Sequence, residues 1–112
     1  MTLSRDLVAA SATPLVLSIL AAQDTYGYDI IKQVRELSGR MMEWTDGMLY
    51  PVLHRLEDHG YVTSYWRIAD TGRRRKYYRI EEPGLDELQR LRSMWESVDA
   101  TLRRAWSAAG AA

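Results

Sequence analysis

Apolar side chains in the stretch 45–60 recur every three or four residues, at Met48 or Leu49, Val52, Leu53 and Leu56. This spacing places them on one face of a helix and leaves the opposite face polar. Thr45 stands where a hydroxyl can accept a hydrogen bond from an unpaired first-turn amide, and Gly60 suits the left-handed residue that ends a helix. We therefore predict an amphipathic helix from Thr45 to Gly60.

The pattern changes after Gly60 from helical spacing to short runs typical of strands. Tyr61–Ile68 and Lys76–Ile80 are rich in β-branched and aromatic residues. The segment Asp70-Thr71-Gly72 between them consists of turn-forming residues. Helix, strand, basic loop, strand is the order of a recognition helix followed by a wing.

Three further helices are expected. Ser4–Ala22 is apolar on more than one face, which predicts burial on several sides, and Pro14 is expected to kink or divide this helix. A second helix covers Tyr26–Ser38, and the loop Gly39–Trp44 joins it to the recognition helix. A long helix follows the hairpin over Pro83–Trp106. Together these elements predict an α+β fold, a winged helix-turn-helix with an N-terminal helix and a long C-terminal dimerisation helix.

The chain is expected to divide into a DNA-binding part and a dimerisation helix. Residues 1–80, including the N-terminal helix at 4–22, would form the winged-helix domain. Residues 81–106 would form the dimerisation helix and residues 107–112 a frayed tail. Apolar residues along the last helix are spaced by three or four, a seam suited to a partner helix. The candidate dimerisation residues are Leu88, Leu91, Trp95, Val98 and Leu102.

The distribution of charge is more informative than its sum. The 112-residue chain has 15 basic and 15 acidic residues, so its net charge is zero. Residues 67–80 nevertheless carry six cations against Asp70 alone, a local charge of +5. A basic patch on an otherwise balanced protein suits a site-specific DNA binder, because it draws phosphates to one edge only.

Composition excludes several other kinds of site. The chain has no cysteine, which excludes disulfides and cysteine-based zinc sites. His54 and His59 are five residues apart and do not share a helical face well, so we predict no metal and no cofactor. Without a nucleophile motif or a phosphate-binding glycine loop, we predict no enzyme. The best apolar run, Pro14–Ala22, is too short to span a membrane, and a signal-type N-terminus is lacking, so we expect a cytoplasmic protein with no membrane partner.

The polar side of the predicted recognition helix supplies the first candidate DNA contacts. The N-terminal residues of such a helix reach base edges in the major groove. The candidates are Thr45, Asp46, Met48, Tyr50 and His54. Alternatively, Thr45 only caps the helix and Tyr50 is partly core. Asp46 either accepts a hydrogen bond from a cytosine amine or supports the cap.

The hairpin tip and the start of the second helix supply the remaining DNA candidates. At the tip stand Arg73, Arg74, Arg75 and Lys76. They would contact phosphates or the minor groove, although such charge runs are usually solvated faces. Tyr26 and Tyr28 either donate to a phosphate at the groove edge or pack beneath the helix start.

Trp95 is the main candidate for small-molecule binding. A large aromatic residue at a seam position either packs in a dimer or stacks on a ligand. Asp99, one helical turn further on, either offers its charge to a cationic ligand or pairs with Arg103. The other tryptophans are interpreted as core or interface residues: Trp44, Trp66 and Trp106.

Three motifs taken together resemble the PadR family of winged-helix transcription regulators in its short form. They are Tyr26–Lys32 (YGYDIIK), Leu49–Gly60 (LYPVLHRLEDHG) and Gly72–Ile80 (GRRRKYYRI). Two further stretches, Ser64–Trp66 and Met94–Asp99, are similar to the multidrug-responsive members. The resemblance covers about residues 5–106.

The resemblance implies a homodimer that represses transcription by binding a palindromic operator. In the multidrug-responsive members, flat aromatic drugs occupy a pore at the dimer centre and stack between paired tryptophans that match Trp95. The effector residues implied in this way are Trp95, Asp99, Leu7, Pro14, Ser18 and Arg92. Met48 stands where a small hydroxyl residue is usual, and Pro14 and Arg92 would make the pore narrower, more charged or absent.

We therefore predict a homodimeric, DNA-binding transcriptional regulator that represses. A hydrophobic, planar aromatic or cationic drug-like molecule at the dimer interface would relieve the repression. The alternative is a winged-helix protein-interaction module that binds no DNA, which the zero net charge allows.

Overall fold

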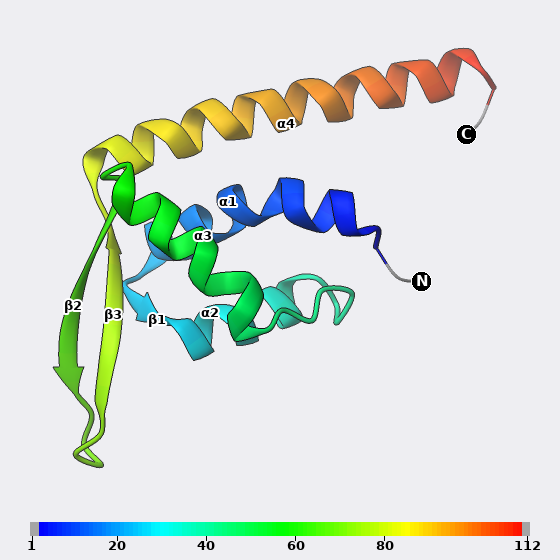
Figure 1. The fold of residues 1–112 in the computed structure, drawn as a ribbon. Helices are drawn as coiled ribbons and strands as arrows, with labels where there is room; N and C mark the ends of the chain where they lie inside the picture. Colours follow the sequence, from blue (N-terminus) through cyan, green and yellow to red (C-terminus); the bar gives the residue numbers. More distant parts are fainter. Residues whose placement is uncertain (1–2, 111–112) are drawn as a thin grey trace.

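The computed structural model describes residues 3–110, which form four helices and three strands (Figure 1). Their order is α1 (Arg5–Ala22), β1 (Thr25–Tyr26), α2 (Gly27–Leu37), α3 (Asp46–Asp58), β2 (Val62–Ile68), β3 (Arg74–Ile80) and α4 (Glu82–Ala108). The predicted α+β class is confirmed, with its N-terminal helix, helix-turn-helix, wing and long C-terminal helix.

Helix α1 forms the centre of the core and is covered on several sides. Its side chains at Val16, Leu17 and Leu20 are almost completely buried. The other helices and the root of the sheet add to the same cluster Ile30, Val34, Leu49, Leu53, Leu56, Val62 and Tyr78. Removing this apolar surface from water is the main driving force for folding, and it requires a central helix that is apolar on more than one face.

Two expectations for α1 concern Pro14 and the length of its apolar run. The helix is continuous through Pro14, so of the two expected effects of this proline, division is wrong and a kink stays a prediction. By length and composition, α1 is the only helix among residues 3–110 that could cross a membrane, because Arg5 and Asp6 are its only charges and its mean hydropathy is 1.4. The core helix of a soluble protein passes the same test, and five side chains of α1 are buried in this core.

The wing is a regular antiparallel hairpin that projects from the body (Figure 1). Strands β2 and β3 pair over their full length, from Val62 opposite Ile80 to Ile68 opposite Arg74. The second strand therefore begins two residues earlier than predicted. Arg74 and Arg75 belong to the ladder because they have partners on β2, and they are not part of the loop.

A short strand that the sequence did not predict joins the wing to the helix-turn-helix. Strand β1 pairs Thr25 with Tyr78 and Tyr26 with Tyr77, so the sheet order is β1-β3-β2. As a result, α2 begins at Gly27, one residue later than expected. This glycine lies very close to α3.

Helix α3 ends as predicted, but its start differs in detail. Gly60 has a φ of +73°, and the amide of Tyr61 donates to the carbonyl of Leu56 at 3.0 Å, as in a Schellman motif. Thr45 occupies the N-cap position. Its hydroxyl makes no capping hydrogen bond within the described residues, so the capping role predicted for that side chain is wrong.

Helix α4 begins at Glu82 and crosses the body above α1 before running on (Figure 1). Near its start, Leu88 and Leu91 pack against the core. From Arg92 to Ala108 every residue except Ala100 is exposed. Residues 107 and 108 belong to this helix, the frayed tail expected over 107–112 stays a prediction, and 111–112 lie outside the described residues.

Candidate nucleic-acid interface

Helix α3 presents one buried face and one exposed face. Leu49, Val52, Leu53 and Leu56 are buried, and they anchor the helix to the core. The opposite side carries all five predicted contact residues, each of them exposed: Thr45, Asp46, Met48, Tyr50 and His54. Tyr50 is 38% exposed, so its ring is partly packed, and its hydroxyl end lies close to Gly27.

The four cations of the wing are not equally available. Arg73 and Arg74 are exposed, and among the described residues neither pairs with a carboxylate. Arg75 and Lys76 are only partly exposed. The ammonium of Lys76 lies 4.0 Å from the carboxylate of Glu57, which offsets part of its charge. Arg73 and Arg74 are therefore the freest cations for a phosphate.

Tyr26 belongs to the same surface as the wing. Its hydroxyl oxygen accepts a hydrogen bond from Arg75 at 3.0 Å, and the guanidinium of Arg75 lies 4.4 Å from the centre of its ring. Cation–π contacts of this kind orient a guanidinium without neutralising it. Tyr28 is 69% exposed, so it does not pack beneath the start of α2.

A hollow of about 470 Å³ lies between the start of α2, the exposed side of α3 and the wing. We call it the basic hollow. It is lined by Tyr26, Gly27, Tyr28, Tyr50, Trp66, Arg73, Arg74, Arg75 and Lys76. Four cations and four aromatic rings thus meet there, and this lining includes no acidic side chain within the described part of the chain. Such a surface combines attraction for phosphate with apolar contact area for sugars and bases.

Trp66 is a candidate contact that the sequence interpretation missed. It was assigned to the core or an interface, but it is 57% exposed and lines the basic hollow. The guanidinium of Arg74 lies 4.7 Å from the centre of its ring. Of the other two tryptophans given that interpretation, Trp44 is confirmed as core and Trp106 is exposed.

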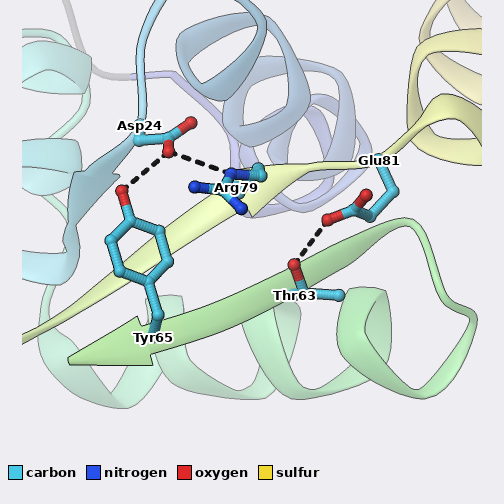
Figure 2. A network of polar contacts seen from close by, with 5 residues as sticks. All are labelled: Asp24, Thr63, Tyr65, Arg79 and Glu81. Atoms are coloured by element: carbon cyan, nitrogen blue, oxygen red, sulfur yellow. Dashed lines mark hydrogen bonds and ion pairs between the residues drawn. The ribbon is translucent and has the colours of Figure 1, made fainter.

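A polar network on the other face of the wing fixes its root (Figure 2). The Oδ2 of Asp24 accepts hydrogen bonds from the Tyr65 hydroxyl at 2.7 Å and from the Arg79 Nε at 3.2 Å. The hydrogen bond to Asp24 raises the pKa of Tyr65 above its ordinary value, because it favours the protonated phenol. Asp24 likewise raises the pKa of Arg79, first through its hydrogen bond. A separate bond joins Thr63 to Glu81.

The predicted effector residues fall into two groups. A groove of about 530 Å³ runs between α1 and α4, and its lining includes Pro14, Ser18, Arg92 and Trp95. Arg92 is already paired with Glu96 through a 2.9 Å contact. The structure therefore brings four of the six implied residues together on one mainly apolar surface.

The remaining two implied effector residues lie outside that lining. Leu7 is exposed on the first turn of α1 and does not line the groove between α1 and α4. The Oδ2 of Asp99 accepts a hydrogen bond from the Nε of Arg103 at 3.0 Å, so Asp99 forms the ion pair with Arg103 that was the alternative to ligand binding. Among the described residues, neither of the two lines the groove beside Trp95.

The predicted dimerisation seam is also divided. Leu88 and Leu91 pack against the chain's own core. Trp95, Val98 and Leu102 remain exposed. The regularly spaced apolar residues of α4 thus pack on the body near the start of the helix and are exposed to solvent further on.

Residues 3–110 contain no group of three or more His, Cys, Asp or Glu side chains placed to hold a metal ion. The fold and the basic hollow instead define a winged helix-turn-helix protein of the DNA-binding class.

Comparisons with known proteins agree with that class. The model of the transcriptional regulator PadR-like family matches residues 16–90. A transcriptional regulator from Clostridium thermocellum is 30% identical with a TM-score of 0.83, over 92% of this chain and 97% of that one. A PadR family transcription regulator from Clostridium difficile R20291 is 33% identical with a TM-score of 0.74, over 84% and 96%. The negative transcriptional regulator PadR of Bacillus subtilis is 30% identical over 73 residues, 65% of this chain but 40% of its own length.

Since the family model matches well over half of the chain, the protein belongs to the PadR-like family of transcriptional regulators. The resemblance noted from three sequence motifs is thereby confirmed at the level of the family. The protein is a DNA-binding transcriptional regulator and not an enzyme.

Proposed function

We propose that this protein is a homodimeric repressor that binds a palindromic operator. The observation that carries the proposal is the basic hollow, which joins the exposed side of α3 to the wing. In this arrangement the start of α3 enters a major groove, and Arg73 and Arg74 reach the flanking phosphates. Trp66 and Tyr28 add apolar contact to the same surface.

Dimerisation is supported by the exposed apolar side chains of α4. Trp95, Val98 and Leu102 are 38%, 52% and 43% exposed on a helix that extends beyond the core. Exposed apolar residues grouped in this way favour a partner surface. A twofold dimer would present two α3 helices to major grooves about one DNA turn, roughly 34 Å, apart. The operator would then be palindromic.

The groove between α1 and α4 supports the proposal of a small-molecule effector. Its lining is mainly apolar and includes the ring of Trp95. A hydrophobic or planar aromatic molecule bound there in the dimer would change the spacing of the two α3 helices and release the operator. Arg92 and Glu96 stand at the same groove as an ion pair, so the effector would have to tolerate both charges.

Repression is supported by the name of one relative, the negative transcriptional regulator of Bacillus subtilis. A repressor of this kind occludes the promoter when bound and dissociates when the effector binds. It would act on chromosomal DNA in the cytoplasm.

A footprint of the purified protein on the DNA upstream of its own gene tests the proposal. We expect protection of two symmetric half-sites about one turn apart, and a dimer by sedimentation. A purified protein that protects no site, or that sediments only as a monomer at micromolar concentration, would contradict it. The first result would favour the protein-interaction module.

The effector step has a separate test. Titration with planar aromatic compounds should quench tryptophan fluorescence in the wild type and not in Trp95→Phe. Trp106→Phe is the matched control, because Trp106 is also exposed on α4 but does not line the groove. An equal response in all three proteins would remove the effector step and leave the DNA-binding proposal intact.

A further inference from the structure

Two carboxylates hold the root of the wing, one from each face. On one face, a single oxygen of Asp24 accepts hydrogen bonds from Tyr65 of β2 and Arg79 of β3 (Figure 2). The Arg79 guanidinium also lies 4.8 Å from the centre of the Tyr65 ring. Asp24 thus connects both strands of the wing to the segment that directly follows α1.

The second carboxylate belongs to α3. Glu57 accepts a hydrogen bond from the Ser64 hydroxyl of β2 at 3.0 Å, and its other oxygen lies 4.0 Å from the ammonium of Lys76 of β3. Ser64 and Tyr65 are neighbours along β2 and therefore project from opposite faces of the sheet. We call Asp24 and Glu57 together the wing clamp.

The wing clamp lies at the base of a long hairpin, so a small rotation there moves the tip by a large distance. Successive strand residues rise by about 3.3 Å, so the turn at Asp70 lies about 17 Å beyond Tyr65. A rotation of only 10° at the root would move the tip by about 3 Å. A hydrogen bond does not survive a displacement of that size, so the angle of the root decides whether Arg73 and Arg74 reach their phosphates.

We propose that Asp24 is a positioning residue for DNA binding: it fixes the angle of the wing relative to α3, with Glu57 holding the opposite face. The inference rests on the proposed DNA contacts of the wing tip and assigns a function to a residue outside them. Asp24 does not line the basic hollow. The side chain of Asp24 acts on the wing through its hydrogen bonds with Tyr65 and Arg79.

Loss of negative charge and loss of wing positioning should change the DNA affinity of an Asp24 variant in opposite directions. Removing an acidic side chain from a DNA-binding protein strengthens its attraction for DNA at long range. Removing a clamp residue loosens the wing and weakens binding to the specific site. The sign of the change in affinity therefore separates the two effects.

The experiment compares Asp24→Ala with Asp70→Ala, using the footprinted DNA and a random duplex of equal length. Asp70 lies in the turn of the wing, is exposed and has no side-chain hydrogen bond or ion pair within the described residues, so its removal takes away a charge without breaking such a contact. We expect Asp70→Ala to bind both DNAs slightly more tightly. We expect Asp24→Ala to lose about tenfold in affinity for the specific site, the equivalent of one charge-assisted hydrogen bond.

The salt dependence gives a second readout that a purely structural role would not change. Loss of wing contacts should make the slope of log K against log salt shallower by about 1 to 2 in Asp24→Ala, although this variant has gained positive charge. Tyr65→Phe, which removes only the hydroxyl that donates to Asp24, should change the specific affinity in the same direction. Thermal melts of each variant check that it folds.

Each outcome decides between the proposals. If the wild type protects a specific site and Asp24→Ala behaves like Asp70→Ala, the clamp is wrong and the proposed function stands. If Asp24→Ala does not fold, an unchanged affinity in Tyr65→Phe overturns the clamp instead. If the wild type binds specific and random DNA equally, the proposed function itself fails.

Discussion

Replacing Arg73 and Arg74 together by alanine should weaken binding to every DNA sequence and flatten its salt dependence. Both side chains are exposed at the tip of the wing, and within the described residues no carboxylate neutralises them. Each cation that neutralises one phosphate contributes about 0.9 to the slope of log K against log salt. The double variant should therefore bind with a slope about 1.8 shallower than that of the wild type.

This slope has a measurable consequence for affinity. Between 50 and 200 mM salt the concentration rises fourfold, so a slope difference of about 1.8 corresponds to about a twelvefold change in the ratio of wild-type to variant affinity. Fluorescence anisotropy with a labelled duplex at four salt concentrations resolves such a change. Lys76→Ala should lower the slope by less than about 0.9, because Glu57 already offsets part of the Lys76 charge.

A matched control removes the same number of charges from a helix outside the wing. Arg103 and Arg104 are two neighbouring exposed arginines on α4, far along the chain from the wing. The double alanine variant at these positions should leave the slope unchanged. If both double variants lower the slope equally, the wing is not the phosphate-binding element and the assignment of the interface is wrong.

Three further predictions concern the body of the protein and its contact with α3. Burial raises the pKa of Tyr78 to about 12, so the folded state keeps the phenol neutral while the unfolded chain ionises near the ordinary pKa of about 10. The free energy of unfolding should therefore fall by about 1–2 kcal/mol between pH 10 and 12, after allowance for partial solvent screening. In urea denaturation, Tyr78→Phe should abolish that loss. Leu53→Ala should lower the free energy of unfolding by about 2–5 kcal/mol, because Leu53 is completely buried, and a smaller loss in urea denaturation would contradict the assigned packing. Gly27→Ala should lower DNA affinity, because the new Cβ would lie 2.7 Å from the Tyr50 hydroxyl oxygen and displace the Tyr50 ring. In a Tyr50→Ala background, the same change should leave the DNA affinity measured by anisotropy titration unchanged.

The helices could be predicted from the sequence because their signals are local. The period of Leu49, Val52, Leu53 and Leu56 and the stop at Gly60 each depend on residues within a turn or two. Strand β1 could not be predicted in this way. Its two residues are a strand only because Tyr77 and Tyr78, some fifty positions later, pair with them. The same distant pairing delays the start of α2.

The errors in the candidate site have a related cause. Ser64 and Trp66 share one face of the wing. Ser64 donates a hydrogen bond to Glu57 of α3, whereas Trp66 lies beyond the body and is exposed to solvent. An alternating pattern gives the face of a strand but not the point where the supporting layer ends. Spacing along α4 has the same limit, since it cannot tell Leu88, which packs on the core, from Val98, which is exposed.

The body and the wing of this molecule are held by different forces, and this separates two kinds of substitution. The body is held by apolar side chains such as Leu53 that are removed from water, whereas the wing root, besides its buried Val62 and Tyr78, is held by polar contacts of Asp24 and Glu57 that are partly open to solvent. Exposed ion pairs contribute little to the free energy of unfolding, typically below about 1 kcal/mol. Core substitutions should therefore change the denaturation midpoint and leave the salt slope alone, while clamp substitutions should do the reverse. Both quantities measured on the same set of variants would show whether the wing is positioned independently of the stability of the body.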